Sequence, residues 1–251
     1  MSARADIGVV ITTHNYGHYL AACLESVLSQ TLLPRQVLVV DDASEDNAAD
    51  VVASFSDVQY CRVDFRNGNR ARNFGFLKVS TSYVAFFDAD NVMMPRFLEV
   101  LYSALQEVPQ ATYAYGDRIV FADGDLQQGE REVSGPFDVR RLRAGNYIDL
   151  AALIRADSFP GFDPAVRRYQ DWDLWLNIAL RHGGIGQYVP EILYYYRVHP
   201  HSVSQREDRD RAMWRIRRKY HLGWGALPLL RHSFKLYQLV RKTKSLLGIK
   251  N

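Results

Sequence analysis

The sequence predicts an α/β protein with a mostly parallel central sheet that helices cover on both faces. Apolar runs such as Ile7–Thr12 and Tyr83–Phe87 show no alternation with polar residues, which is typical of strands buried on both faces. These runs alternate with stretches whose apolar residues recur at helical spacing, such as Tyr19–Gln30. Sheets of this kind bind ligands beyond the carboxyl ends of their strands.

The expected elements follow one another in a regular order. Strands are expected at 7–12, 36–42, 58–64 and 83–87, and helices at 19–30, 44–55 and 69–80. A helix to about 108 follows Pro95, and a strand is expected near 112–121, before a Gly/Asp turn at 123–125. A less regular stretch to about 164 leads to a helix at 171–183 and a strand at 192–198.

Composition and charge divide the chain at about residue 205. With 251 residues, of which 47% are hydrophobic, the chain can bury a sizeable core. Residues 1–205 carry 18 Lys/Arg against 25 Asp/Glu, whereas residues 206–251 carry 13 against 3. The sequence therefore predicts a body at 1–205 and a basic, amphipathic helical tail at 206–251. The tail fits two settings equally, an anionic lipid surface or packing on the body or on another subunit.

Several classes of protein are disfavoured by the same survey. Cys23 and Cys61 have neither disulfide nor zinc spacing, which favours buried thiols in a reducing compartment. No signal sequence precedes the first strand, and no apolar run reaches the ~20 residues that span a bilayer. We expect a cytoplasmic protein, with peripheral attachment to the inner face of the cell membrane as the tail's contribution. An acidic body without a recognition motif argues against nucleic acid as a partner.

Clustered acids at a strand end indicate the chemistry. The run Tyr83–Phe87 leads directly into Asp88 and Asp90, a DxD motif. The turn after the first strand holds only Gly17, and no GK[ST] follows any glycine, so dinucleotide-binding and P-loop sites are disfavoured. Carboxylates hold a diphosphate only through a hard cation, so we expect Mn²⁺ or Mg²⁺ here. The alternative is that Asp88 and Asp90 have a structural role only and cap the helix that starts near Pro95.

The order of the motifs along the chain is similar to that of a known protein family. The stretches "VVITTHNYGHYL", "VLVVDDAS", "GNRARNFGF", "YVAFFDADN", "GFDP", "QDWDLWL" and "YRVHPHSVS" together resemble the pattern of glycosyltransferase family 2 over residues 5–205. The resemblance implies a GT-A-type, Rossmann-like sandwich, with a nucleotide-sugar-binding part at about 1–110 and an acceptor-binding part at about 111–205. It also implies a metal-dependent, inverting, hexosyltransferase-like enzyme of cell-surface polysaccharide or glycoconjugate biosynthesis.

The resemblance also implies roles for single residues near the donor, a nucleotide-diphosphate sugar. The residues expected to contact the donor are Thr12, Asn15, Asp42, Arg72, Asp88 and Ala89. Asp42 would accept hydrogen bonds from a pyrimidine, and Arg72 would face the diphosphate. Metal ligands are expected at Asp88, Asp90 and His199, with His201 as the alternative histidine. Asn91 stands where relatives often have a further Asp.

For the reaction itself, the resemblance implies that Asp171 is the general base. It would act on a hydroxyl of a saccharide or lipid-linked saccharide acceptor. Gln170 stands where the family commonly has Glu, and Asp173 is expected to serve only the helix N-terminus. The acceptor side is expected to include Trp172, Gly161 and Phe162, although aromatic residues at the spacing of Trp172 and Trp175 equally fit a core.

Two other functions remain open from the sequence. A glycoside hydrolase would use two carboxylates across a scissile bond. A relative without catalysis would bind nucleotide sugars only. The sequence does not reveal which base and sugar the donor carries. Nor does it identify the acceptor.

Overall fold

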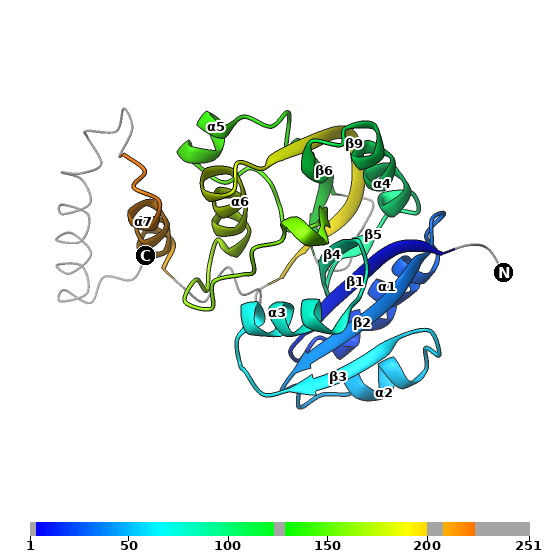
Figure 1. Ribbon diagram of the computed structural model, residues 1–251. Coiled ribbons are helices and arrows are strands. Elements are labelled where there is room, and N and C mark those ends of the chain that lie inside the picture. The colour runs from blue at the N-terminus through cyan, green and yellow to red at the C-terminus, as the bar shows by residue number, and fades with distance from the viewer. Residues whose placement is uncertain (1–3, 123–128, 200–207, 224–251) are drawn as a thin grey trace, which may run out of the picture.

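A computed structural model describes residues 4–122, 129–199 and 208–223 and has the expected α/β architecture. Figure 1 shows helices on both sides of a twisted sheet. The helices are α1 (Gly17–Leu28), α2 (Ala48–Ala53), α3 (Gly68–Lys78), α4 (Phe97–Glu107), α5 (Val139–Ala144), α6 (Gln170–Arg181), α7 (Arg209–Lys219) and the short 3₁₀ helix η2 (Ala156–Ser158). The strands are β1 (Ala5–Thr13), β2 (Pro34–Asp42), β3 (Gln59–Val63), β4 (Tyr83–Asp88), β5 (Val92–Met93), β6 (Ala111–Ala122), β7 (Glu130–Glu132), β8 (Ala152–Arg155) and β9 (Ile185–Val198).

The sheet is built in two halves. Its order is β3-β2-β1-β4-β8-β6-β9-β5, and β7 pairs with β6. In the first half, β3, β2, β1 and β4 are all parallel, as the sequence predicts. Their carboxyl ends therefore meet at one edge, where Thr12 of β1 lies opposite Asp88 of β4.

The second half of the sheet is mixed. Strand β8 runs antiparallel between β4 and β6, β9 runs parallel to β6, and β5 runs antiparallel to β9. The expectation of a mostly parallel sheet thus describes the first half, and the segment expected to be irregular supplies β8. A four-residue strand flanked by turns gives little periodic signal, which is why the sequence did not reveal it.

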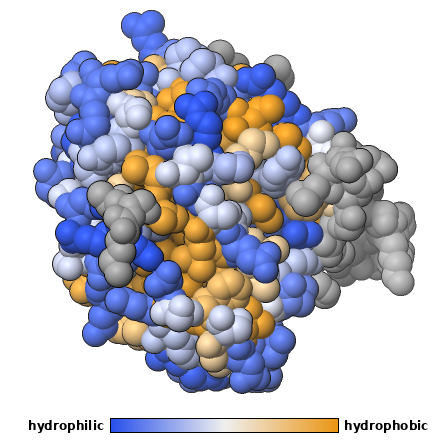
Figure 2. All heavy atoms as spheres, turned by 90° about the vertical axis from the view of Figure 1, so that its right-hand side faces the viewer, coloured by the Kyte–Doolittle hydropathy of each residue, from blue (hydrophilic) through white to orange (hydrophobic). Residues whose placement is uncertain are grey.

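The two faces of the sheet bury separate apolar layers. Val9 and Ile11 of β1 pack with α1 and α4, whereas Val10 packs on the opposite face, because successive side chains of a strand alternate. That second layer holds α3, α6 and α7. Figure 2 shows that apolar side chains also reach the surface, as a strip between hydrophilic residues on the side that lies at the right of Figure 1.

Local hydrogen bonds set the starts of several helices. The side chain of Asn67 caps α3 by accepting from the backbone N–H groups of Asn69 and Arg70. Helix α2 starts later than the sequence suggests, because the Ser44 N–H is bound by Asp41 Oδ1 at 2.8 Å in a turn that precedes the helix. Helix α6 begins after Tyr169, whose φ of 61° lies in the left-handed region.

The C-terminal region is described as far as residue 223. Helix α7 confirms helical structure at 209–219, whereas the boundary near 205, the expected turn at 123–125 and most of the tail lie outside the described residues. Among the helices of the described segments, none combines the length and the apolar character that crossing a bilayer requires.

Candidate functional site

The carboxylates of the DxD motif lie where β4 ends. Asp88 pairs across the sheet with Thr12, and the next residue in the chain, Ala89, is fully buried. The side chain of Asp88 is 35% exposed and that of Asp90 13% exposed. The fold therefore presents two acids, one of them largely buried, at the edge where parallel α/β sheets bind ligands.

Asp90 is joined to the end of β9. His199 Nε2 lies 3.0 Å from Asp90 Oδ2, and its ring packs edge-on against Tyr16, with centroids 5.2 Å apart. Burial and the charge of Asp88 raise the pKa of Asp90 to about 6. Asn91 accepts a hydrogen bond from the backbone N–H of Arg197 at 3.0 Å, which fixes the same strand. The predicted pair Asp90 and His199 is thus brought together, and His201 lies outside the described residues.

Arg72 connects the DxD motif to the helix that carries Asp171. Its guanidinium is buried and donates from Nη2 to Asp88 Oδ1 at 2.7 Å and from Nη1 to Gln170 Oε1 at 2.8 Å. Gln170 immediately precedes Asp171 in the first turn of α6. Arg72 therefore ties Asp88 to the first turn of α6, at the residue next to Asp171.

The carboxylate of Asp171 has two donors. Asn146 Nδ2 donates to Oδ2 at 2.7 Å, and the backbone N–H of Trp172 donates to Oδ1 at 2.8 Å. Burial and the nearby charge of Asp149 nevertheless raise the pKa of Asp171 to about 6. A carboxylate with such a pKa is suited to take up a proton near neutral pH.

Three residues that the sequence analysis did not select lie between the two acidic positions. Arg118 forms an ion pair with Asp149, and its guanidinium lies 4.3 Å from the ring centroid of Tyr196. Burial raises the pKa of Tyr196, and the charges of Asp149 and of the DxD acids act in the same direction. The one available signal was the charged pair Asp117 and Arg118 inside a strand that is otherwise largely apolar.

The "GFDP" loop is held against α3 by asparagines. Asn73 accepts from the backbone N–H of Phe162 and donates to its carbonyl, both at 2.8 Å. Asn69 Nδ2 donates to the carbonyl of Asp163 at 2.8 Å. Gly161 has a φ of +87°, which favours glycine. Because Phe162 is only 4% exposed, the loop offers backbone and not this ring to a ligand.

The side chains of Asp42 and Asn15 hold the loops at the other end of the site through hydrogen bonds. Asp42 Oδ1 accepts from the backbone N–H groups of Phe65 and Arg66 at 2.6 and 2.8 Å, and Oδ2 accepts from Asn67 at 2.6 Å. Asn15 accepts from the backbone N–H of Glu45 at 2.7 Å. Both side chains thus order the chain next to β1 and β2, and their contacts with a donor remain predictions.

The placement of Trp172 corrects one expectation. Its side chain is 1% exposed, and its indole N–H donates to the carbonyl of Leu142 at 2.7 Å. Trp175 stacks on Tyr113 with ring centroids 4.2 Å apart. Both indoles are core residues, so the Trp172 ring does not line an acceptor surface. Their spacing on α6 places both on the helix face that packs on the sheet.

The residues present fit a cation that is shared with a ligand. Within the described residues no three His, Cys, Asp or Glu side chains gather as a ready cage. Two carboxylates at a strand end are nevertheless what Mg²⁺ needs when phosphate oxygens and water complete its shell. The raised pKa of Asp90 fits as well, because a cation would relieve the repulsion between Asp90 and Asp88.

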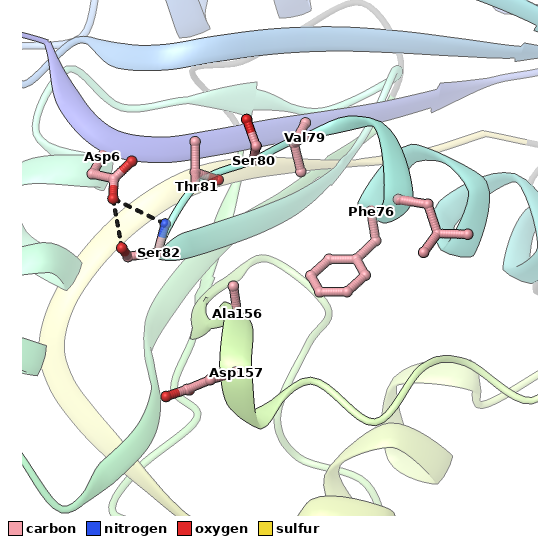
Figure 3. Close-up of a pocket in the computed structure, with 9 residues that line it drawn as sticks. Asp6, Phe76, Val79, Ser80, Thr81, Ser82, Ala156 and Asp157 are labelled. Carbon is pink, nitrogen blue, oxygen red and sulfur yellow. Dashed lines mark hydrogen bonds between the residues drawn. The ribbon is translucent and has the colours of Figure 1, made fainter.

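A cavity of about 560 Å³ lies at the opposite end of the strands. Figure 3 shows its lining, which includes Asp6 near the start of β1, Ser82 before β4, and Asp157 of η2. The backbone N–H of Ser82 donates to Asp6 at 3.1 Å. This cavity is separate from the DxD motif, which follows the carboxyl end of β4.

A family model and curated relatives both match this chain to glycosyltransferases. The family model described as "Glycosyl transferase family 2" matches residues 8–143. The chain is 30% identical over 123 residues to glycosyltransferase GlyA of Streptococcus pneumoniae, which covers 47% of this chain and 18% of GlyA. It is 29% identical over 244 residues to the UDP-Glc:alpha-D-GlcNAc-diphosphoundecaprenol beta-1,3-glucosyltransferase WfgD of Escherichia coli, covering 91% of this chain and 95% of WfgD.

A solved structure confirms the fold. The structure of S. aureus TarS 1-349 in complex with UDP-GlcNAc matches with a TM-score of 0.67 at 15% identity, covering 85% of this chain and 65% of that one. At this identity the likeness concerns the fold, and it confirms the predicted GT-A-type sandwich. The chain spans less than two thirds of both GlyA and the TarS fragment.

Proposed function

The chain belongs to glycosyl transferase family 2, and from this premise we propose that it transfers a sugar, with inversion, from a nucleotide-diphosphate sugar to an acceptor hydroxyl. The observation that carries the proposal is the bridge made by Arg72. It joins Asp88, at the end where a diphosphate would lie, to Gln170 beside Asp171. The helix turn that carries the proton acceptor is thereby tied to a carboxylate of the donor site.

Asp88 and Asp90 would hold Mn²⁺ or Mg²⁺, with His199 next to Asp90. When bound, such a cation supplies positive charge that stabilises the departing nucleoside diphosphate. The two carboxylates lie at the strand edge where the family's donors bind, and the exposure of Asp88 leaves it accessible to a ligand.

Asp171 would remove the proton from the acceptor hydroxyl as that oxygen attacks the anomeric carbon. Asn146 keeps Oδ2 of Asp171 in place, and the N–H of Trp172 keeps Oδ1 in place. Attack from the face opposite the leaving diphosphate gives inversion. Arg72 would keep Asp88 and the first turn of α6 in register during the reaction.

A UDP-hexose and a lipid-diphosphate-linked sugar are the substrates we propose. WfgD, whose name specifies UDP-Glc and a diphosphoundecaprenol-linked acceptor, aligns with this chain over 95% of its length. The structural neighbour TarS was solved with UDP-GlcNAc. These relatives support uridine as the base and polysaccharide assembly as the setting.

The test is a transfer assay with a panel of UDP-sugars and a synthetic polyprenyl-diphosphate sugar, with Mn²⁺ or EDTA. The parent protein should give product only with metal. Asp171→Asn should bind donor as the parent does but lose at least about a hundredfold in transfer. Asp157→Asn, an exposed acid at the other end of the sheet, is the matched control and should transfer as the parent does.

Two outcomes would contradict the proposal. Donor hydrolysis that no acceptor diverts into transfer would favour the glycoside hydrolase alternative. Donor binding without turnover under any condition of the panel would favour the relative that has lost catalysis.

The basic segment after Gly223 supports a further partner, an anionic membrane surface. Residues 224–251 contain 6 Lys/Arg and no Asp or Glu, interleaved with aromatic and leucine residues. Ending the chain at residue 223 should abolish co-sedimentation with phosphatidylglycerol vesicles at low salt and leave donor binding unchanged. Equal sedimentation of both proteins would remove the membrane from the proposal.

A further inference from the structure

Helix α7 packs on the body through one face. Its residues Ala212 and Ile216 are at most 2% exposed, and Tyr220 after it is 7% exposed. Ile216 and Tyr220 belong to the same apolar cluster as Trp172 of α6. Figure 1 shows α5, α6 and α7 gathered at the end of the molecule away from α1 and α2. Helix α7, in the described part of the basic tail, therefore shares a core with the helix that carries Asp171.

Lys219, the last residue of α7, joins two parts of the body. Its Nζ lies 2.7 Å from Asp163 Oδ2 and 2.7 Å from Asp173 Oδ1. Asp163 belongs to the "GFDP" loop, and Asp173 lies in the first turn of α6, two residues after Asp171. Because Asp173 is only 3% exposed, its charge depends on this cation.

Arg217 acts on the loop that approaches Asp171 from the other side. It is 9% exposed, and its Nη1 donates to the carbonyl of Ala144 at 3.2 Å, where α5 ends. Two residues later, Asn146 donates to Asp171. Lys219 and Arg217 thus reach both the helix turn that carries Asp171 and the loop that orients it.

We propose that α7 is a positioning element for Asp171, with Lys219 and Arg217 fixing the α6 turn and the 144–146 loop relative to each other. This inference rests on the proposed function. Neither side chain touches Asp171, so both would act through Asp173 and Asn146. A measurable effect on rate is expected, because a misplacement of about 1 Å at a reacting group can cost on the order of a hundredfold in rate.

The test compares Lys219→Met with Arg218→Met, a change at the neighbouring exposed cation of the same helix. In the transfer assay at saturating donor, Lys219→Met should lose at least about tenfold in kcat, while its Kd for UDP stays within about twofold of the parent. Arg218→Met should match the parent in both. Leu105→Ala, in the core on the other face of the sheet, controls for stability. It should lower Tm but not kcat, measured well below Tm.

A second variant covers the case in which Lys219→Met does not fold. Asp173→Asn with Lys219→Met removes both charges of this ion pair together, so that no unpaired charge is left at the buried position 173, and should fold and show the same selective loss in kcat. Parental kcat in either folded variant overturns the inference, and so does an equal loss of UDP binding. Absence of transfer by the parent protein would instead overturn the proposed function, and the inference with it.

Discussion

Asn146 donates a 2.7 Å hydrogen bond to Asp171, and the two residues come from different elements, the loop after α5 and the first turn of α6. The contact stabilises the charged form of a carboxylate whose pKa burial raises to about 6. It therefore limits a shift that would otherwise leave the proposed base protonated.

Replacing Asn146 with Ala should raise the pKa of Asp171 further. A hydrogen bond to a charged group contributes roughly 1.5 kcal/mol, so the acid limb of kcat should move up by about one pH unit. The measurement is kcat against pH at saturating donor and metal. Under these conditions the titration of Asp171 is observed without a contribution from the protonation of Asp90. Asn177→Ala, further along α6, is the control. An unmoved limb would mean that another group titrates.

Replacing Asp171 with Asn should stabilise the fold at neutral pH. The pKa of Asp171 is raised in the folded protein, to about 6, so the folded state binds more protons than the unfolded chain, and its stability falls as pH rises from about 4 to 6. Partial exposure reduces the effect, and we expect a gain of roughly 1–3 kcal/mol in unfolding free energy at pH 7.

At pH 4, where this carboxyl is largely protonated in the folded protein, the gain should nearly vanish. Urea unfolding at both pH values checks the prediction. A variant that is less stable than its parent at pH 7 would show that the hydrogen bonds of Asp171 outweigh its burial.

Replacing Asp90 with Asn should weaken metal-dependent binding of UDP by at least about tenfold, because the cation loses a charged oxygen ligand. The fold should tolerate the change, since burial and Asp88 already raise the pKa of Asp90. Calorimetric titration of UDP with Mn²⁺ and with EDTA measures it, with Asp50→Asn as a surface control. Unchanged affinity in Mn²⁺ would remove Asp90 from the site.

Replacing Asp42 with Asn should destabilise the protein whatever its role toward a donor. The carboxylate accepts from three backbone N–H groups of residues 65–67, and an amide can satisfy fewer of them. We expect a loss of about 2–4 kcal/mol in unfolding free energy, against less than about 0.5 kcal/mol for Asp64→Asn on the same loop. Parental stability of Asp42→Asn would show that the loop is held elsewhere.

What the sequence could predict was local. The apolar run of β4 located Asp88 and Asp90 at a strand end, because buried strands leave a continuous signal. The same reasoning located β1 and β2, whereas a helical pattern followed by glycines located α6. Strand β8 escaped because four residues carry no measurable period, and its place between β4 and β6 depends on pairing with both.

What it could not predict depends on distant partners. Asp173 was expected to serve its own helix, yet it meets Lys219, 46 residues later. No local pattern marks such a pair, because its spacing is set by the packing of α7. Trp172 shows the converse difficulty, since an aromatic residue on an amphipathic helix has the same sequence signature whether it faces a core or a ligand.

The position of β8 also bears on the order in which the protein assembles during synthesis. The parallel strands β1, β2, β3 and β4 are complete once residue 88 has been made, but β4 gains its other neighbour only with residues 152–155. Until then the unpaired backbone N–H and C=O groups along this edge of an apolar strand are open to pairing with another chain. The interval spans more than 60 residues, several seconds at about 5–20 residues per second. Slowing or misfolding of the 111–155 segment should therefore increase aggregation through the edge of β4, a hazard that the finished fold conceals.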